Sequence, residues 1–172
     1  LELLFQVIDI LESVQTAQAE QSNLVMSGYF GKHVVTTGSG FEVAYGAASG
    51  AKYELQASSA RGELAVYDGT GALVRRMELG PREPGTYDVQ WDARDMDLNT
   101  VPDGPYRFQI NFYDQDDSYI PTQTYQTNRV EGLVFENGRT LLDLGDSRVV
   151  VQDVVQVVDR PPVIKAEVRP ED

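Results

Sequence analysis

Cysteine is absent from this chain of 172 residues, and histidine occurs once. The chain therefore forms no disulfide, thiolate nucleophile or zinc-thiolate site. No run of eighteen apolar residues is present, and no basic segment leads into an apolar one, so neither a membrane span nor a cleaved signal peptide is predicted. Basic residues are scarce, 14 against 27 acidic, and the formal charge of −13 repels phosphate. Nucleic acid and anionic membrane surfaces are therefore poor partner candidates.

The sequence that is present favours a mainly β fold. Fifteen glycines and eight prolines lie between short apolar segments, as in a domain of short strands and tight turns. Alternating apolar residues at 32–36 and 41–45 flank a Gly-rich turn and predict an opening hairpin. The middle block predicts five strands, which fit a compact Greek-key sandwich: residues 53–57, 63–67, 73–79, 85–91 and 106–113.

Beyond an acidic link at 114–118, the strands resume. Strands are predicted at residues 119–128, 129–136, 140–144, 148–151 and 154–158, with Asn137 and Gly138 as a two-residue hairpin turn. Neither the opening hairpin nor this last block completes a stable sheet alone. We therefore expect the two to form one small barrel, with the middle block inserted and a two-stranded hinge at 46–50 and 114–118.

The first 27 residues predict a helix because they hold no glycine or proline and repeat apolar residues at three- and four-residue steps. Its N-terminal half is too apolar for an isolated surface helix. We expect an oligomerisation or docking helix that packs through Leu1, Leu4, Ile8 and Leu11; packing against its own domain is the alternative. Because the chain begins with leucine and not methionine, we expect a longer parent protein.

Residues that carry chemistry are few, and no catalytic or cofactor-binding residue is predicted. His33 lies in an apolar strand, where a structural role is favoured, and no serine sits in a nucleophile elbow. Asp92, Asp95 and Asp97 are close enough in sequence to surround a hard cation such as Ca²⁺. Their spacing matches no EF-hand loop, so solvated turn chemistry is favoured over metal binding.

Several segments, in order along the chain, resemble the family of bacterial flagellar hook-capping proteins, FlgD. The similarity runs from the helix to about residue 158. It rests on GKHVV at 31–35, GELAVYDGTGALVR at 62–75, WDARD at 91–95 with VPDGPYRF at 101–108, and RVEGLVFENG at 129–138 with LLDLG at 141–145. Ala93 departs from the family pattern, which has glycine after Trp-Asp.

The resemblance implies a Tudor-like small barrel interrupted by a fibronectin type III or Ig-like sandwich. The expected domains are a helix at 1–27, a discontinuous barrel at 28–47 and 115–160, the inserted sandwich at 48–114, and a flexible tail at 161–172. The implied function is a non-enzymatic scaffold that caps the hook and promotes polymerisation of hook subunits. The implied partners are hook protein and further copies of the chain. The implied location is the extracellular hook tip, reached through the flagellar type III apparatus, although the family's N-terminal export segment is absent here.

Two other classes of function are weighed against this one. A secreted binding module of carbohydrate or adhesion type would use exposed aromatics such as Tyr113, Tyr119 and Tyr125 as a platform, although strand packing is the favoured role for these rings. A hydrolase with paired carboxylates ranks last, because no αβ scaffold or pocket is predicted to hold them.

Overall fold

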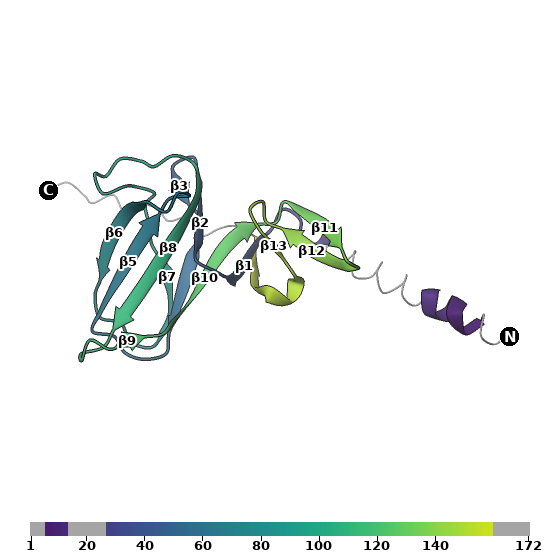
Figure 1. Ribbon diagram of the computed structural model, residues 1–172, viewed down its shortest axis with the longest axis horizontal. Helices are drawn as coiled ribbons and strands as arrows, with labels where there is room; N and C mark the ends of the chain where they lie inside the picture. Colours follow the sequence, from purple (N-terminus) through teal and green to yellow (C-terminus); the bar gives the residue numbers. More distant parts are fainter. Residues whose placement is uncertain (1–5, 14–26, 160–172) are drawn as a thin grey trace.

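The computed structural model describes residues 6–13 and 27–159, which fold as a mainly β protein with a helical segment at 6–13. A β-sandwich forms the larger part, and the strands of a smaller region lie beyond one of its ends (Figure 1). One sheet of the sandwich contains β3 (Ala47–Ala48), β2 (Gly40–Ala44), β8 (Gly104–Tyr113), β5 (Arg61–Tyr67) and β6 (Leu73–Leu79), with β9 (Tyr119–Ile120) paired to β8. The predicted mainly β fold with a sandwich is confirmed.

A second sheet runs through both parts of the molecule. Its order is β14 (Val154–Val158), β1 (His33–Thr37), β10 (Thr122–Arg129), β4 (Ala51–Leu55) and β7 (Gly85–Val89). Residues 122–126 of β10 pair with β4 in the sandwich, and residues 125–129 pair with β1 in the smaller region. One strand thus carries hydrogen bonds from one part of the molecule to the other.

The smaller region completes itself with a three-stranded sheet of β11 (Gly132–Glu136), β12 (Arg139–Asp143) and β13 (Arg148–Val149), followed by a 3₁₀ turn at Val151–Asp153. β11 and β12 are joined by Asn137 and Gly138, whose φ angles of 50° and 74° suit the predicted two-residue turn. The strands of the smaller region surround a small core of Val34, Val130, Leu142 and Leu144, and the arrangement resembles part of a barrel.

The sandwich core is larger and rich in aromatic residues. Alternate residues of β8 point inward, so Tyr106, Phe108, Ile110 and Phe112 are all buried. Trp91 is 1% exposed, and its ring lies 5.3 Å from that of Phe41 and 5.2 Å from that of Tyr106. Phe41 and Val43 belong to this core, whereas their segment was predicted to join the barrel; the division into domains otherwise stays a prediction.

The predicted opening hairpin is wrong, because β1 and β2 enter different sheets. The chain crosses between the sheets at Gly38 and Gly40, where a Cβ would lie 2.5 Å and 2.7 Å from side-chain atoms of Gln126. The Gln126 Oε1 accepts a hydrogen bond from the Gly40 N–H at 2.8 Å. A Cβ at either position would require the Gln126 side chain to move away from the Gly40 N–H, and these glycines mark a sheet crossing and not a hairpin turn.

The predicted hinge is also misplaced. Residues 46–50 run from the turn between β2 and β3, through β3, to the residue before β4. Residues 114–118 form the turn between β8 and β9, and these two strands pair with each other. Both segments therefore lie within the sandwich. The strands that link the two parts are β1 and β10, which are hydrogen-bonded side by side.

One five-residue turn occurs three times in the sandwich, starting at Asp68, Asp95 and Asp114. In each, the aspartate Oδ1 accepts hydrogen bonds from the backbone N–H groups two and four residues later, at 2.8 to 3.0 Å. The fourth residue of each turn has a positive φ: Gly71, Leu98 and Asp117. The bonds from the Thr70 hydroxyl and nearby backbone lower the pKa of Asp68. Each aspartate thus accepts hydrogen bonds from backbone N–H groups that the turn leaves without a backbone acceptor.

Ala93 occupies the position at which the family pattern has glycine. Its φ is 54° and it is fully buried. Left-handed backbone is most readily adopted by glycine, which gives the family pattern a physical reason. The turn is nevertheless well anchored, because the Trp91 Nε1 donates to the Arg94 carbonyl at 3.0 Å and the Val101 N–H donates to the Ala93 carbonyl at 2.9 Å.

Replacing Trp91 with alanine should lower the free energy of unfolding by about 3–5 kcal/mol, because the large ring fills the centre of the sandwich core. Chemical denaturation followed by circular dichroism measures this loss. The control is Phe135→Ala, since Phe135 is 63% exposed and its loss should change stability by less than about 0.5 kcal/mol. A loss of under about 1 kcal/mol for Trp91→Ala would contradict the packing described.

Gly62→Ala should destabilise the protein by about 1–3 kcal/mol through overpacking. Gly62 pairs with Phe112, and a Cβ at Gly62 would lie 2.3 Å from that buried ring. Gly69→Ala is the matched control, because nothing lies within 4 Å of its Cβ position. Its effect should fall between no change and a gain of about 1 kcal/mol. Equal losses in the two variants, measured by thermal melting, would refute the close approach of Phe112.

Candidate functional site

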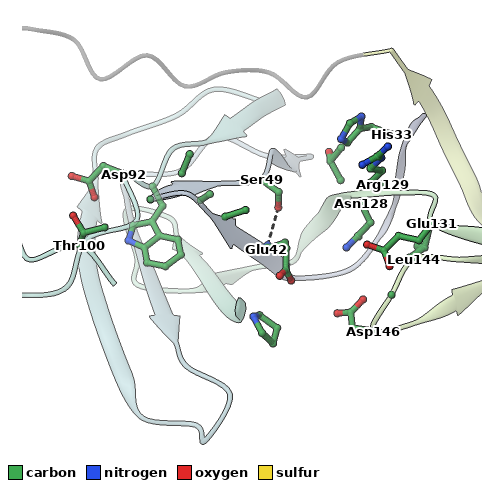
Figure 2. A pocket seen from close by; sticks show the side chains of 18 of the residues that line it. His33, Glu42, Ser49, Asp92, Thr100, Asn128, Arg129, Glu131, Leu144 and Asp146 are labelled. Carbon is green, nitrogen blue, oxygen red and sulfur yellow. Dashed lines mark hydrogen bonds between the residues drawn. The ribbon is translucent and has the colours of Figure 1, made fainter. Parts of the chain in front are cut away.

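A cleft of about 1030 Å³ lies where the sandwich meets the smaller region. In Figure 2, Asp92 and Thr100 lie on one side of it, Glu42 and Ser49 in the middle, and Asn128, Glu131 and Asp146 on the other. Its walls come from segments far apart in the sequence: β1, the β2–β3 hairpin, the loop after β7, the second half of β10, and the turn after β12. The cleft therefore exists only because β10 holds the two parts together.

The β2–β3 hairpin forms the floor between the two sides. Glu42 and Ser49 are joined by two hydrogen bonds: the Glu42 N–H donates to the Ser49 Oγ at 3.0 Å, and the Ser49 N–H donates to the Glu42 carbonyl at 2.8 Å. Small residues Ala44, Gly46 and Ala47 follow along the same wall. This backbone is fixed and carries little side-chain bulk, which leaves the cleft open.

Carboxylates from both parts of the molecule face the cleft. Partial desolvation raises the pKa of Glu42, and the negative charges of Asp146, Glu131 and Asp103 raise it further. A carboxyl with a raised pKa favours the fold most when protonated, so this contribution is lost as the pH rises through the pKa of the folded state. The cleft therefore has a preference for positive charge near Glu42.

His33 and Arg129 form a basic corner of the cleft in Figure 2, and Arg94 lines the cleft as well. Burial lowers the pKa of His33, and the Arg129 guanidinium lowers it further. The His33 Nδ1 and the Asn128 Oδ1 are buried without hydrogen-bond partners. An imidazole that resists protonation and bonds to no hydroxyl through Nδ1 is a poor general base. The corner contributes shape and polarity and not a nucleophile pair.

The predicted acidic loop is divided by the structure. Asp92 is exposed and lines the cleft, whereas the Asp95 Oδ1 is engaged by its own turn and Asp97 is exposed. Within residues 6–13 and 27–159, no group of three or more histidine, aspartate or glutamate side chains is placed to hold a metal ion. The weak cation hypothesis for Asp92, Asp95 and Asp97 gains no cluster from the fold and stays a prediction.

The four apolar residues predicted for oligomerisation fall at the N-terminus. Leu1 and Leu4 lie outside the described residues. Ile8 and Leu11 lie on the helix at 6–13 with exposed fractions of 48% and 55%. No helix in the described part of the chain is both long and apolar enough to cross a membrane.

The three tyrosines weighed as a ligand platform do not share one surface. Tyr113 lies 6.1 Å from Tyr119, centroid to centroid, but the Arg61 guanidinium covers the Tyr113 ring at 4.1 Å. Tyr125 belongs to the other sheet, and its hydroxyl is hydrogen-bonded to the Glu54 carboxylate at 3.1 Å. Strand packing and local pairing account for the positions of these rings.

Sequence reasoning did not find the cleft, although it had noticed His33 and Asp92. No short motif marks it, since its residues come from at least five segments whose proximity depends on the pairing of β1 with β10. A faint signal was available in the Gly-Ala-Ala-Ser run after Tyr45, where small residues leave room beside a strand.

A family model described as the FlgD Ig-like domain matches residues 38–116. Among curated proteins, the basal-body rod modification protein FlgD of Salmonella typhimurium is 29% identical over 105 residues, and that of Escherichia coli is 28% identical over 105 residues. Both alignments cover 61% of this chain and 45% of the relative. The chain thus spans about half the length of the curated relatives it matches.

Two solved structures share the fold. FlgD from Pseudomonas aeruginosa superposes with a TM-score of 0.66 at 27% identity, covering 73% of this chain and 95% of that one. FlgD from Xanthomonas campestris superposes with a TM-score of 0.66 at 18% identity, covering 78% of this chain and 98% of that one. That structure is described as giving insight into the hook capping essential for flagellar assembly. The chain is thus similar to FlgD proteins in its matched Ig-like domain and in the further β region that β10 joins to it.

Proposed function

We propose that this chain is the capping portion of a flagellar hook assembly protein, a non-enzymatic scaffold that promotes polymerisation of hook subunits. The observation that carries the proposal is the joint similarity of the sandwich and the smaller region to FlgD from Pseudomonas aeruginosa, at 27% identity over nearly all of that structure. A match to the Ig-like domain alone would indicate only a fold, because Ig-like domains serve many functions.

The chemistry of the described residues agrees with a scaffold. The cleft offers carboxylates, a poorly basic imidazole and small side chains, without an activated nucleophile or a metal cluster. The FlgD family is accordingly one of flagellar assembly proteins and not of enzymes.

The proposed partners are hook protein subunits and further copies of this chain. Support for self-association comes from the helix at 6–13, where Val7, Ile8, Ile10 and Leu11 are between 48% and 60% exposed. A short helix with so many exposed apolar residues is stabilised when it packs against another apolar surface.

The proposed place of action is the distal end of the hook, outside the cell, with export through the flagellar type III apparatus. The absence of cysteine suits a chain that is exported before it folds, since no disulfide has to be made on arrival.

Deleting the gene of the parent protein should abolish hooks, and expressing the full-length wild-type protein should restore them. Electron microscopy of isolated basal bodies counts the hooks directly. A matched deletion of residues 38–116, replaced by a short Gly-Ser linker, should fail to restore them if the sandwich takes part in assembly. Normal hooks in the deletion strain would overturn the proposed function.

Self-association should be lost in the double variant Ile8→Glu, Leu11→Glu of the full-length protein, because charge replaces the apolar surface of the helix. Size-exclusion chromatography with light scattering measures the molar mass. The control is Gln6→Glu, Ser13→Glu, which adds the same two charges to the same helix and leaves its apolar residues intact. An unchanged oligomer in the first variant would contradict a role for this helix.

A further inference from the structure

Tyr45 stands out on the surface because no residue of the described part of the chain covers it. It is 100% exposed, at the tip of the β2–β3 hairpin, where Ala44 pairs with Ala47 and leaves Tyr45 and Gly46 as the turn. The φ angle of Tyr45 is 54°. A positive φ is uncommon outside glycine, asparagine and aspartate, and for a bulky residue it marks a turn under strain. Local packing and local backbone both disfavour tyrosine at this position.

The same chain contains a second turn of this type with the expected residue. Asn137 and Gly138 join β11 to β12 with φ angles of 50° and 74°, and Tyr45 and Gly46 have 54° and 74°. Asparagine is the residue that tolerates this backbone. The comparison indicates that the hairpin needs Gly46 and has no structural need for the ring of Tyr45.

The hairpin tip is nevertheless held firmly. The Asp103 carboxylate accepts hydrogen bonds from the Tyr45 N–H at 3.0 Å and from the Gly46 N–H at 3.4 Å. The loop that carries Asp103 is in turn fixed, since the buried Tyr106 donates its hydroxyl to the Pro102 carbonyl at 2.8 Å. A backbone held in this way loses little conformational entropy on binding.

The surroundings of Tyr45 indicate the chemistry of a partner. Ala44, Gly46 and Ala47 line the cleft, so Tyr45 stands at its rim and is not one of the side chains that line it. Carboxylates lie nearby: Asp103 beneath the turn, and Glu42 and Asp92 on the cleft wall. An exposed aromatic side chain with a polar end, carried on a fixed backbone beside carboxylates, suits an apolar pocket bordered by basic residues.

We propose that Tyr45 is the anchor of an interaction surface at the cleft rim, and that it enters a phenol-sized apolar pocket, bordered by lysine or arginine, on the hook subunit. This inference rests on the proposed function, and it names one contact by which the chain would bind the hook subunit. The strained backbone of Tyr45 is then retained for binding, while stability alone favours asparagine.

The test measures two properties of the same variants of the full-length protein. Tyr45→Asn should raise the melting temperature by roughly 2–4 °C, because it relieves the backbone. It should also weaken binding to purified hook protein from the same bacterium by at least about 10-fold, measured by biolayer interferometry. Tyr45→Phe, which keeps the ring, should bind within a few fold of wild type.

Tyr119→Asn is the matched control. Tyr119 is 55% exposed and pairs with Tyr113 at the far end of β8 from the hairpin tip, so this variant should bind hook protein like wild type. Wild-type binding by Tyr45→Asn would overturn the inference and leave the proposed function intact. Failure of the wild-type protein itself to bind hook protein would overturn the proposed function. If Tyr45→Asn melts below wild type, Tyr45→Gly replaces it, and unchanged binding by a folded Tyr45→Gly variant overturns the inference equally.

Discussion

The hydrogen bonding of β10 is the constraint on which the relation between the two parts of the molecule depends. Tyr125 and Gln126 pair with β1 on one side and with β4 on the other, so the smaller region and the sandwich share these residues. The Gln126 side chain also holds the crossing at Gly40. Rotation of one part against the other would break these bonds. The cleft, whose walls come from both parts, takes its shape from this strand.

Negative charge is used in two different ways on this framework. Asp68, Asp95 and Asp114 are engaged by turn backbone at 2.8 to 3.0 Å, which limits what they offer to a partner. Glu42, Glu131 and Asp146 face the cleft instead, where the raised pKa of Glu42 reflects partial burial and the charge of its neighbours. The overall charge of −13 therefore does not tell how much negative charge a partner meets at the cleft. That depends on where each carboxylate lies.

The strands were predictable from the sequence because their signals are local. The predicted strands at 73–79 and 154–158 coincide with β6 and β14, and Asn137 with Gly138 identified the β11–β12 turn. The pairing of β1 was not predictable in this way. Gly38 and Gly40 resemble hairpin glycines in the sequence, and only the position of Gln126, nearly ninety residues later, shows why they lack side chains. The cleft was missed for the same reason, since no local pattern joins His33 to Asp92.

The shared strand also implies an order of folding. β1 and its partner residues in β10 are separated by about ninety residues, and closing so long a loop is entropically costly and slow in an unfolded chain. Once the sandwich has formed, β10 is already held beside β4, and β1 needs only to add to a strand in place. We therefore expect the smaller region to form on a template that the sandwich provides, with the sandwich core first and the second core last.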